Sequence, residues 1–156
     1  MSEILSFLKD TEVFKGLADQ DLESIAAICK PARYEKGQVI VEEDIREREL
    51  YIIKSGRVNI SLSPPGSQEV RGTLTKCAPG QVFGELSFID GARRSTWVTA
   101  LEDVEVCRIR WESFNGIVQA KPEIGYRVMA NLARVIADRL RDTTMLCSNL
   151  LMVRVT

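Results

Sequence analysis

FGELSFIDGARRST, residues 83–96, decides how this chain is interpreted, because it interrupts a succession of strand-like segments. On both sides of it, apolar and polar residues alternate with the two-residue period of a β-strand. Within it, residues 85–89 instead fit one or two turns of helix, introduced by Gly84. The stretch is therefore expected to be a short helix set between strands.

Outward from this stretch, strand-like segments recur at short and regular intervals. Apolar residues spaced by two are Val39, Val41, Leu50, Ile52, Val58, Ile60 and Leu62, and further strands are expected at residues 97–100 and 104–109. The clusters between them carry Gly37, Gly56, Gly66 and Gly80 where a tight turn needs a positive φ. This cadence is typical of a β-sandwich or barrel. The charged run at residues 46–49 is interpreted as a solvated loop.

Helical patterns flank the β segments. Apolar residues at three-to-four spacing predict a helix over residues 4–30, divided at Gly16, with Asp19 as the N-cap of its second part. A brief helix is expected at residues 112–119, and Pro122 opens a long one that reaches about Leu150. We expect one domain over residues 1–156, with N-terminal helices at 1–30, a β unit at 31–110 and C-terminal helices at 111–156.

The long helix carries a second pattern. Met129, Ala133, Ile136, Leu140, Thr143, Cys147 and Leu150 alternate by four and three residues, which is the spacing of a coiled-coil seam. The pattern predicts a homodimer through this helix. A short seam is ambiguous, however, and the alternative is that the same face packs on the chain's own β unit.

Composition narrows the class of function. The 156 residues carry a net charge of −1, which disfavours binding to nucleic acid by this chain alone. Histidine is absent and the four cysteines are far apart, so we expect neither a metal site nor an enzyme of the Ser-His or Cys-His type. No apolar run has the length of a membrane span, and no basic signal segment is present. We expect a cytoplasmic protein with reduced thiols.

The residues in the interrupting stretch suit an anion with a neighbouring hydroxyl. Gly84 lets a phosphate approach the first amides of the helix, and Arg94 adds a planar cationic fork. Glu85 would repel a phosphate unless it accepts hydrogen bonds from another group, and a ribose hydroxyl fits that role. The glycine-rich loops that hold triphosphates and dinucleotides are absent. The residues therefore point to a nucleotide with a single phosphate charge.

F-G-E-L followed by R-S-T-W-V resembles the phosphate-binding cassette of the cyclic nucleotide-binding domain family. The similarity extends from V-F-K-G-L-A-D-Q-D-L through L-Y-I-I-K-S-G-R-V to the last helix. It implies a mainly β fold, a jelly-roll-type β-roll (double-stranded β-helix) with N-terminal helices and a long C-terminal helix. It also implies a ligand and no cofactor. Ser95 favours cyclic AMP, with cyclic GMP as the alternative.

The resemblance also implies roles for individual residues. Glu85 would accept from the ribose 2′-hydroxyl, and Arg94 would pair with the cyclic phosphate. The backbone at Gly84 and Leu86, the Ser95 hydroxyl and the Thr96 amide would complete the phosphate site. Two positions, Glu43 and Arg93, depart from the usual pattern of the family and affect loop shape rather than ligand chemistry.

A-D-R-L-R-D-T-T is similar to a stretch in which some family members contact adenine with a polar pair. Thr143 falls on the predicted seam, where a polar side chain is costly unless a partner bonds it. We expect the base to be capped by Thr143 of one chain and Thr144 of the other, with Arg139 nearby.

Three functions follow as hypotheses. The first is a stand-alone sensor, in which ligand binding moves the C-terminal helix and changes a surface for an effector protein of unknown identity. The second is the ligand-binding half of a transcription regulator whose DNA-binding domain is absent from this chain. The third is a degenerate module that acts only in protein–protein interaction. The lack of histidine and of metal ligands argues against a phosphodiesterase.

Overall fold

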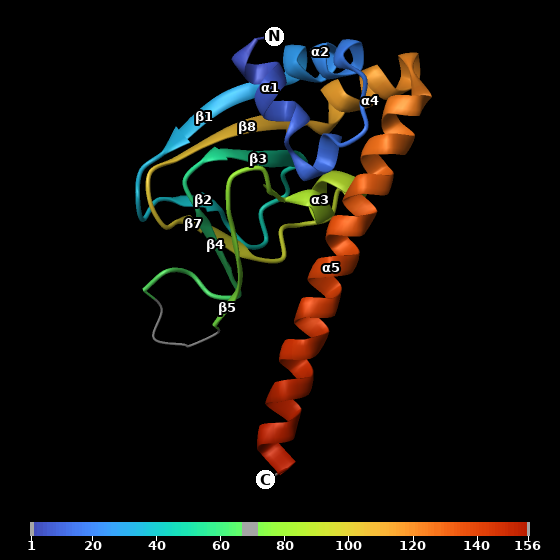
Figure 1. The fold of residues 1–156 in the computed structure, drawn as a ribbon. Helices are drawn as coiled ribbons and strands as arrows, with labels where there is room; N and C mark the ends of the chain where they lie inside the picture. The colour runs from blue at the N-terminus through green and yellow to red at the C-terminus, as the bar shows by residue number, and fades with distance from the viewer. Residues whose placement is uncertain (1, 67–71, 156) are drawn as a thin grey trace.

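A computed structural model describes residues 2–66 and 72–155 as two four-stranded antiparallel sheets with helices at one side (Figure 1). The first sheet has the order β1 (Lys30–Tyr34), β8 (Val104–Arg110), β3 (Glu49–Ser55) and β6 (Val82–Phe83). The second has the order β2 (Val39–Val41), β7 (Trp97–Ala100), β4 (Val58–Ser61) and β5 (Thr73–Cys77). The predicted mainly β fold, the jelly-roll-type β-roll, is confirmed.

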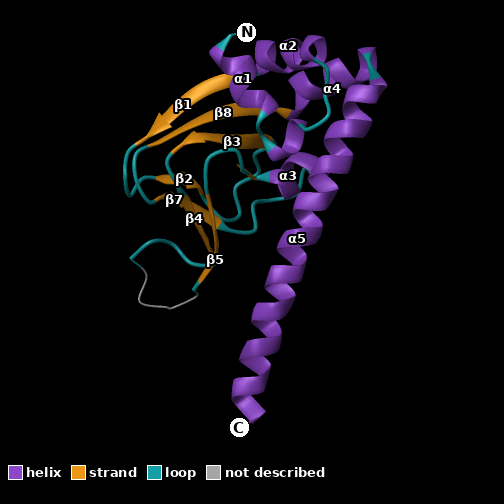
Figure 2. Cartoon of the chain, viewed as in Figure 1, coloured by secondary structure: helices purple, strands orange, loops and turns teal. Residues whose placement is uncertain are grey.

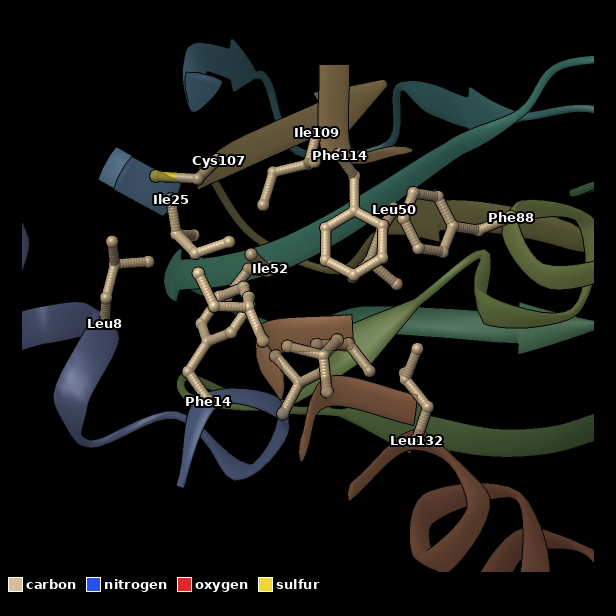
Figure 3. Close-up of a cluster of buried hydrophobic side chains, with 14 of the residues drawn as sticks. Leu8, Phe14, Ile25, Leu50, Ile52, Phe88, Cys107, Ile109, Phe114 and Leu132 are labelled. Atoms are coloured by element: carbon tan, nitrogen blue, oxygen red, sulfur yellow. The ribbon is translucent and has the colours of Figure 1, made fainter. Parts of the chain in front are cut away.

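In strand β3, successive side chains alternate between the two faces of the first sheet. Leu50 and Ile52 point into a core shared with the helices (Figure 3), while Tyr51 and Ile53 point into the core between the two sheets. All four side chains are almost fully buried. The first sheet is therefore a middle layer, covered by helices on one face and by the second sheet on the other.

The helices gather at one end of the β-roll, and the last one runs far beyond it (Figure 2). They are α1 (Glu3–Lys9), η1 (Glu12–Phe14, a 3₁₀ turn), α2 (Asp19–Ile28), α3 (Glu85–Asp90), α4 (Trp111–Ala120) and α5 (Pro122–Val155). The glycines predicted to close tight turns, at positions 37, 56, 66 and 80, all have φ between 78° and 85°.

Three local predictions need correction. The N-terminal helix does not run to residue 30, because α2 ends at Ile28 and Lys30 begins a strand. The N-cap of α2 is the extended residue Ala18, whereas Asp19 is already helical. The run 46–49 is not wholly a solvated loop, because Glu49 begins β3, is 9% exposed and pairs with Arg108 across 2.6 Å.

Helix α5 divides into a packed half and an exposed half. Ile124, Val128, Leu132 and Val135 lie at helical spacing and are buried against the other helices and the first sheet. From Leu140 onward the seam residues Leu140, Thr143, Cys147 and Leu150 are exposed. Of these four, Thr143 borders a cavity beside the second sheet, whereas Leu140, Cys147 and Leu150 are not packed on the chain's own β unit.

One buried amide fixes α5 to the start of the chain. The Asn131 side chain is 6% exposed, and its nitrogen donates to the carbonyls of Val13 at 3.0 Å and Lys15 at 2.9 Å. A buried amide with two such bonds satisfies its donors and specifies one docking position for the helix. The 3₁₀ turn η1 and α5 are thus joined as one unit.

Across residues 2–66 and 72–155, no helix combines the length and apolarity needed to span a bilayer. Over the same residues, no set of three histidine, cysteine or acidic side chains is grouped as metal ligands would be.

Candidate functional site

The predicted site residues meet around one cavity of about 190 Å³ between the second sheet, the 83–96 stretch and α5. Those that line it are Gly84, Glu85, Leu86, Arg94, Ser95, Thr96, Arg139 and Thr143. Thr144 does not line it in this chain. Its hydroxyl is exposed and donates to the carbonyl of Leu140 at 2.8 Å. The structure therefore brings the cassette and the last helix to a single pocket.

Gly84 precedes the first turn of α3 in a conformation that favours glycine. Its φ is 78° and its ψ is 13°, which is the left-handed region. Space also requires glycine, because a Cβ here would lie 2.6 Å from Arg94 Nη1 and 3.0 Å from the carbonyl oxygen of Glu49. The backbone at the pocket wall therefore depends on the absence of a side chain.

Arg94 is buried beside that glycine, with only 4% of its surface exposed. Nη1 donates to the carbonyl of Gly84 at 2.8 Å and Nη2 donates to the carbonyl of Glu49 at 2.9 Å. Nε is also buried, and it has no hydrogen-bond partner among the described residues. Burial lowers the pKa of Arg94 from its very high ordinary value, while nearby carboxylates, Glu47 first among them, oppose that change. The guanidinium is thus held by two carbonyls, and its buried Nε–H remains available to a further acceptor.

Glu85 and Arg139 form an ion pair across the pocket. Arg139 Nη1 lies 2.7 Å from Glu85 Oε1, and both side chains are mostly enclosed. Arg139 also donates to the carbonyl of Val82 and to the Cys77 sulfur. Burial alone would lower the pKa of Arg139, but the Glu85 carboxylate raises it above its ordinary value. The carboxylate predicted to hold a sugar hydroxyl is therefore already engaged by α5.

Arg48 supports α3 without lining the cavity, and this role was not predicted from the sequence. Its Nε donates to the carbonyl of Phe88 at 2.9 Å and its Nη2 to that of Ile89 at 2.7 Å, at the C-terminal end of α3. Its guanidinium carbon lies 3.9 Å from the centre of the Trp111 ring at the start of α4. Charge pattern suggested a solvated arginine, and only the fold brings these carbonyls to it.

Other residues line the cavity without having been predicted. They are Val41, Ile60, Leu74, Thr75, Ser87, Val98 and Asp142. The alternation of β2 and β4 predicted Val41 and Ile60 as strand residues, but not which cavity their side chains face. Asp142 directly precedes the threonine pair, so its helical position was the one available signal.

Comparison with known proteins adds independent findings. A family model described as "Cyclic nucleotide-binding domain" matches residues 31–121. The "Cyclic AMP receptor protein" of Thermus thermophilus is 30% identical over 86% of this chain and 60% of its own length. A "cAMP-dependent protein kinase regulatory subunit" of Debaryomyces hansenii is 30% identical over 72% of this chain and 24% of its own length.

A solved structure has a similar fold. The crystal structure of the Thermus thermophilus catabolite activator protein aligns with a TM-score of 0.74 at 28% identity. The alignment covers 90% of this chain and 63% of the other. The chain therefore spans about 60% of the length of the bacterial relatives that it matches.

Proposed function

The chain belongs to the cyclic nucleotide-binding domain family, and from this premise we propose that its cavity binds cyclic AMP and signals through α5. In this proposal the protein is a regulatory sensor and performs no catalytic step. A cytoplasmic location stays a prediction. The observation that carries the proposal is the enclosure of Arg94, Glu85 and Gly84 around one cavity of about 190 Å³.

The phosphate would lie at Arg94. The unpartnered Nε–H supplies a buried donor, and a buried donor without a partner is unfavourable until an acceptor reaches it. The Ser95 hydroxyl and the backbone at residues 84–86 and 96 border the same cavity and add neutral donors. A single guanidinium with neutral donors suits one negative charge better than several.

The ribose would lie at Glu85. An ionised carboxylate accepts several hydrogen bonds, so Glu85 has capacity for a 2′-hydroxyl in addition to Arg139 Nη1. The ribose 2′-hydroxyl and Arg139 on α5 would then both donate to the Glu85 carboxylate. A ligand shifts a conformational equilibrium only through its different affinity for the two states, and this shared carboxylate supplies such a difference. Movement of α5 on binding is accordingly part of the proposal.

The base would face Thr143 and Asp142, which line the cavity from α5. We retain cyclic AMP over cyclic GMP on the basis of Ser95, and Thr143 offers a hydroxyl to the exocyclic amino group. Thr144 of a second chain would complete the cap, as the sequence predicts.

A homodimer through α5 accounts for the exposed half of this helix. Leu140, Met145, Leu150 and Leu151 are each more than 60% exposed in the single chain. Sedimentation equilibrium is expected to show a dimer, and Leu150→Glu is expected to weaken it, because a charge at the seam opposes association. Glu112→Gln on α4 is the control. A monomeric wild-type protein, with or without cyclic AMP, would contradict the dimer and the cap by Thr144 of a second chain, but not the contacts proposed at Arg94 and Glu85.

A second candidate function comes from the relatives. Proteins 29% identical to this chain are named "CRP-like cAMP-activated global transcriptional regulator", and the chain covers 60% of their length. The same pocket would then be the ligand-binding half of a transcription regulator, with a DNA-binding unit outside the sequence described. In either case the effector is a protein or domain whose contact with this chain depends on the position of α5.

Titration calorimetry with cyclic AMP, cyclic GMP and 5′-AMP tests the proposal. We expect one site per chain, preference for cyclic AMP, and weak binding of 5′-AMP, which carries more charge and an open phosphate. Arg94→Lys is expected to reduce affinity at least about tenfold, because lysine lacks the planar fork. Glu85→Gln tests the sugar contact separately.

Arg93→Lys is the matched control, since Arg93 is exposed and pairs with Asp44 on the loop surface. Its affinity is expected to stay within about twofold of wild type. A folded wild-type protein that binds neither cyclic nucleotide would overturn the proposal. Wild-type affinity in both Arg94→Lys and Glu85→Gln would overturn the site assignment.

A further inference from the structure

Two cysteines lie together at the junction of the N-terminal helices with the β-roll, on the opposite side of the first sheet from the inter-sheet core. Cys29 is the C-cap of α2, directly before β1, and Cys107 lies in the middle of β8. Both belong to the core that the helices share with the first sheet. In Figure 3 Cys107 points from β8 into this core beside Ile25.

Strand register explains why the two sulfurs meet. Pro31 pairs with Cys107 and Lys30 with Arg108 in the antiparallel ladder of β1 and β8. Cys29 is two residues before Pro31, so it lies on the same face as Cys107 and diagonally across from it. Cys29 precedes the paired residues, and its backbone N–H donates to the carbonyl of Ala26 in α2 at 3.2 Å. The two thiols are in hydrogen-bond contact.

The two thiols differ in acidity and exposure. The hydrogen bond from Cys29 lowers the pKa of Cys107 to about 7, against the opposing effect of burial and with help from Lys54. The same contact, with burial, raises the pKa of Cys29. Cys29 is half-buried and Cys107 is buried. The contact therefore favours ionisation of Cys107 over that of Cys29, and a thiolate is the form of cysteine that begins disulfide formation.

We propose that Cys29 and Cys107 are a reversible oxidation site for hydrogen peroxide and end as an intrachain disulfide. The Cys107 thiolate attacks one peroxide oxygen and the O–O bond breaks, which gives a sulfenic acid on Cys107 and hydroxide. Cys29 sulfur then attacks the Cys107 sulfur. The S–O bond breaks, and water leaves with the Cys29 proton. Overall, two thiols and one peroxide give one disulfide and two waters.

The site does not depend on nucleotide binding, because neither cysteine lines the cavity. The disulfide would act instead by restricting movement between α2 and the first sheet. The disulfide would join the end of α2 to β8, an inner strand of the first sheet that pairs with β1 on one side and with β3 on the other. A thiol donor such as glutathione would reverse it.

The test uses the full chain with Cys147→Ser, which removes the exposed thiol and leaves three of the four cysteines. After treatment with hydrogen peroxide, thiol titration is expected to show the loss of two thiols. Peptide mapping is expected to show residues 29 and 107 linked, with a mass about 2 Da lower, and dithiothreitol is expected to restore both.

A second variant, Cys29→Ala in the same background, tests whether Cys29 is the partner of Cys107 in the disulfide. It is expected to leave Cys107 as a sulfenic or sulfinic acid, with no disulfide. Cys107→Ala is expected to leave Cys29 unreacted under the same conditions. Loss of no thiols in the parent protein, or a disulfide that involves Cys77, would overturn the proposal. A melting curve confirms that each variant is folded.

Discussion

The Arg139 guanidinium on α5 lies 2.7 Å from the Glu85 carboxylate at the start of α3. The exposed half of α5 begins at Leu140, directly after Arg139, so the contact joins the wall of the pocket to the start of that half. Because both side chains are mostly enclosed, the pair is subject to little screening by solvent. Its strength therefore bears on stability even without a ligand.

Removal of the Arg139 side chain is expected to leave Glu85 as a buried charge without its cation. Arg139→Ala should lower the free energy of unfolding by about 3 kcal/mol, measured by urea denaturation. Arg134→Ala, at an exposed position of the same helix, should change it by less than about 0.5 kcal/mol. The double variant Arg139→Ala with Glu85→Gln should lose less than the sum of the single losses. Strict additivity would show that the pair is not energetically coupled.

Addition of a methyl group at Gly84 is expected to disturb Arg94. Gly37 has a similar φ, 85°, but a Cβ there would meet nothing within 4 Å. Gly37→Ala should therefore cost about 1 kcal/mol, from backbone strain alone. Gly84→Ala should cost more and should also weaken cyclic AMP binding, because Arg94 is held by two carbonyls and cannot move away freely. Equal losses of stability in the two variants would show that Arg94 can move away from the added methyl group without any loss in the free energy of unfolding.

Replacement of Arg48 is expected to loosen α3 and to change the surroundings of Trp111. Arg48→Met removes two bonds to helix carbonyls and the cation over the indole ring, a loss of about 2 kcal/mol in stability. Near-ultraviolet circular dichroism should change in the tryptophan region. Arg46→Met makes the same chemical change at an exposed neighbour and should leave both measurements unaltered. Identical behaviour of the two variants would exclude a supporting role for Arg48.

Oxidation of the Cys29–Cys107 pair is expected to depend on pH. Because the pKa of Cys107 is lowered to about 7, the reactive thiolate should form as pH rises through 7, and the initial rate with peroxide should level off near pH 8. Lys54, which also contacts Glu3 at 3.2 Å, favours the thiolate. Lys54→Met should move the midpoint to higher pH. A wild-type midpoint near 8.5, the value of an ordinary thiol, would contradict the expected acidity.

Local pattern was sufficient for the elements that alternate simply. Strand residues such as Leu50, Ile52 and Val58, and the helix opened by Pro122, were predicted because period and punctuation are local properties. Most of the candidate pocket was also predictable, since Gly84, Glu85 and Arg94 lie within one continuous stretch.

Long-range packing set the limit of the prediction. Leu74, Val98 and Thr75 reach the cavity only because the second sheet places β5, β4 and β7 side by side. Arg48 and Glu49 looked solvated because charge is normally exposed, and only the carbonyls of α3 and the Arg108 side chain compensate for their burial. Register, rather than composition, brings Cys29 to Cys107.

The bonds from Asn131 to Val13 and Lys15 have a practical consequence for anyone who engineers this protein. Residues 13–15 are remote in sequence from the cavity, yet they hold by hydrogen bonds the same helix that carries Arg139. Truncations that remove these residues are expected to loosen the docking of α5 and so to change the position of Arg139 at the cavity, although they touch no residue that lines it.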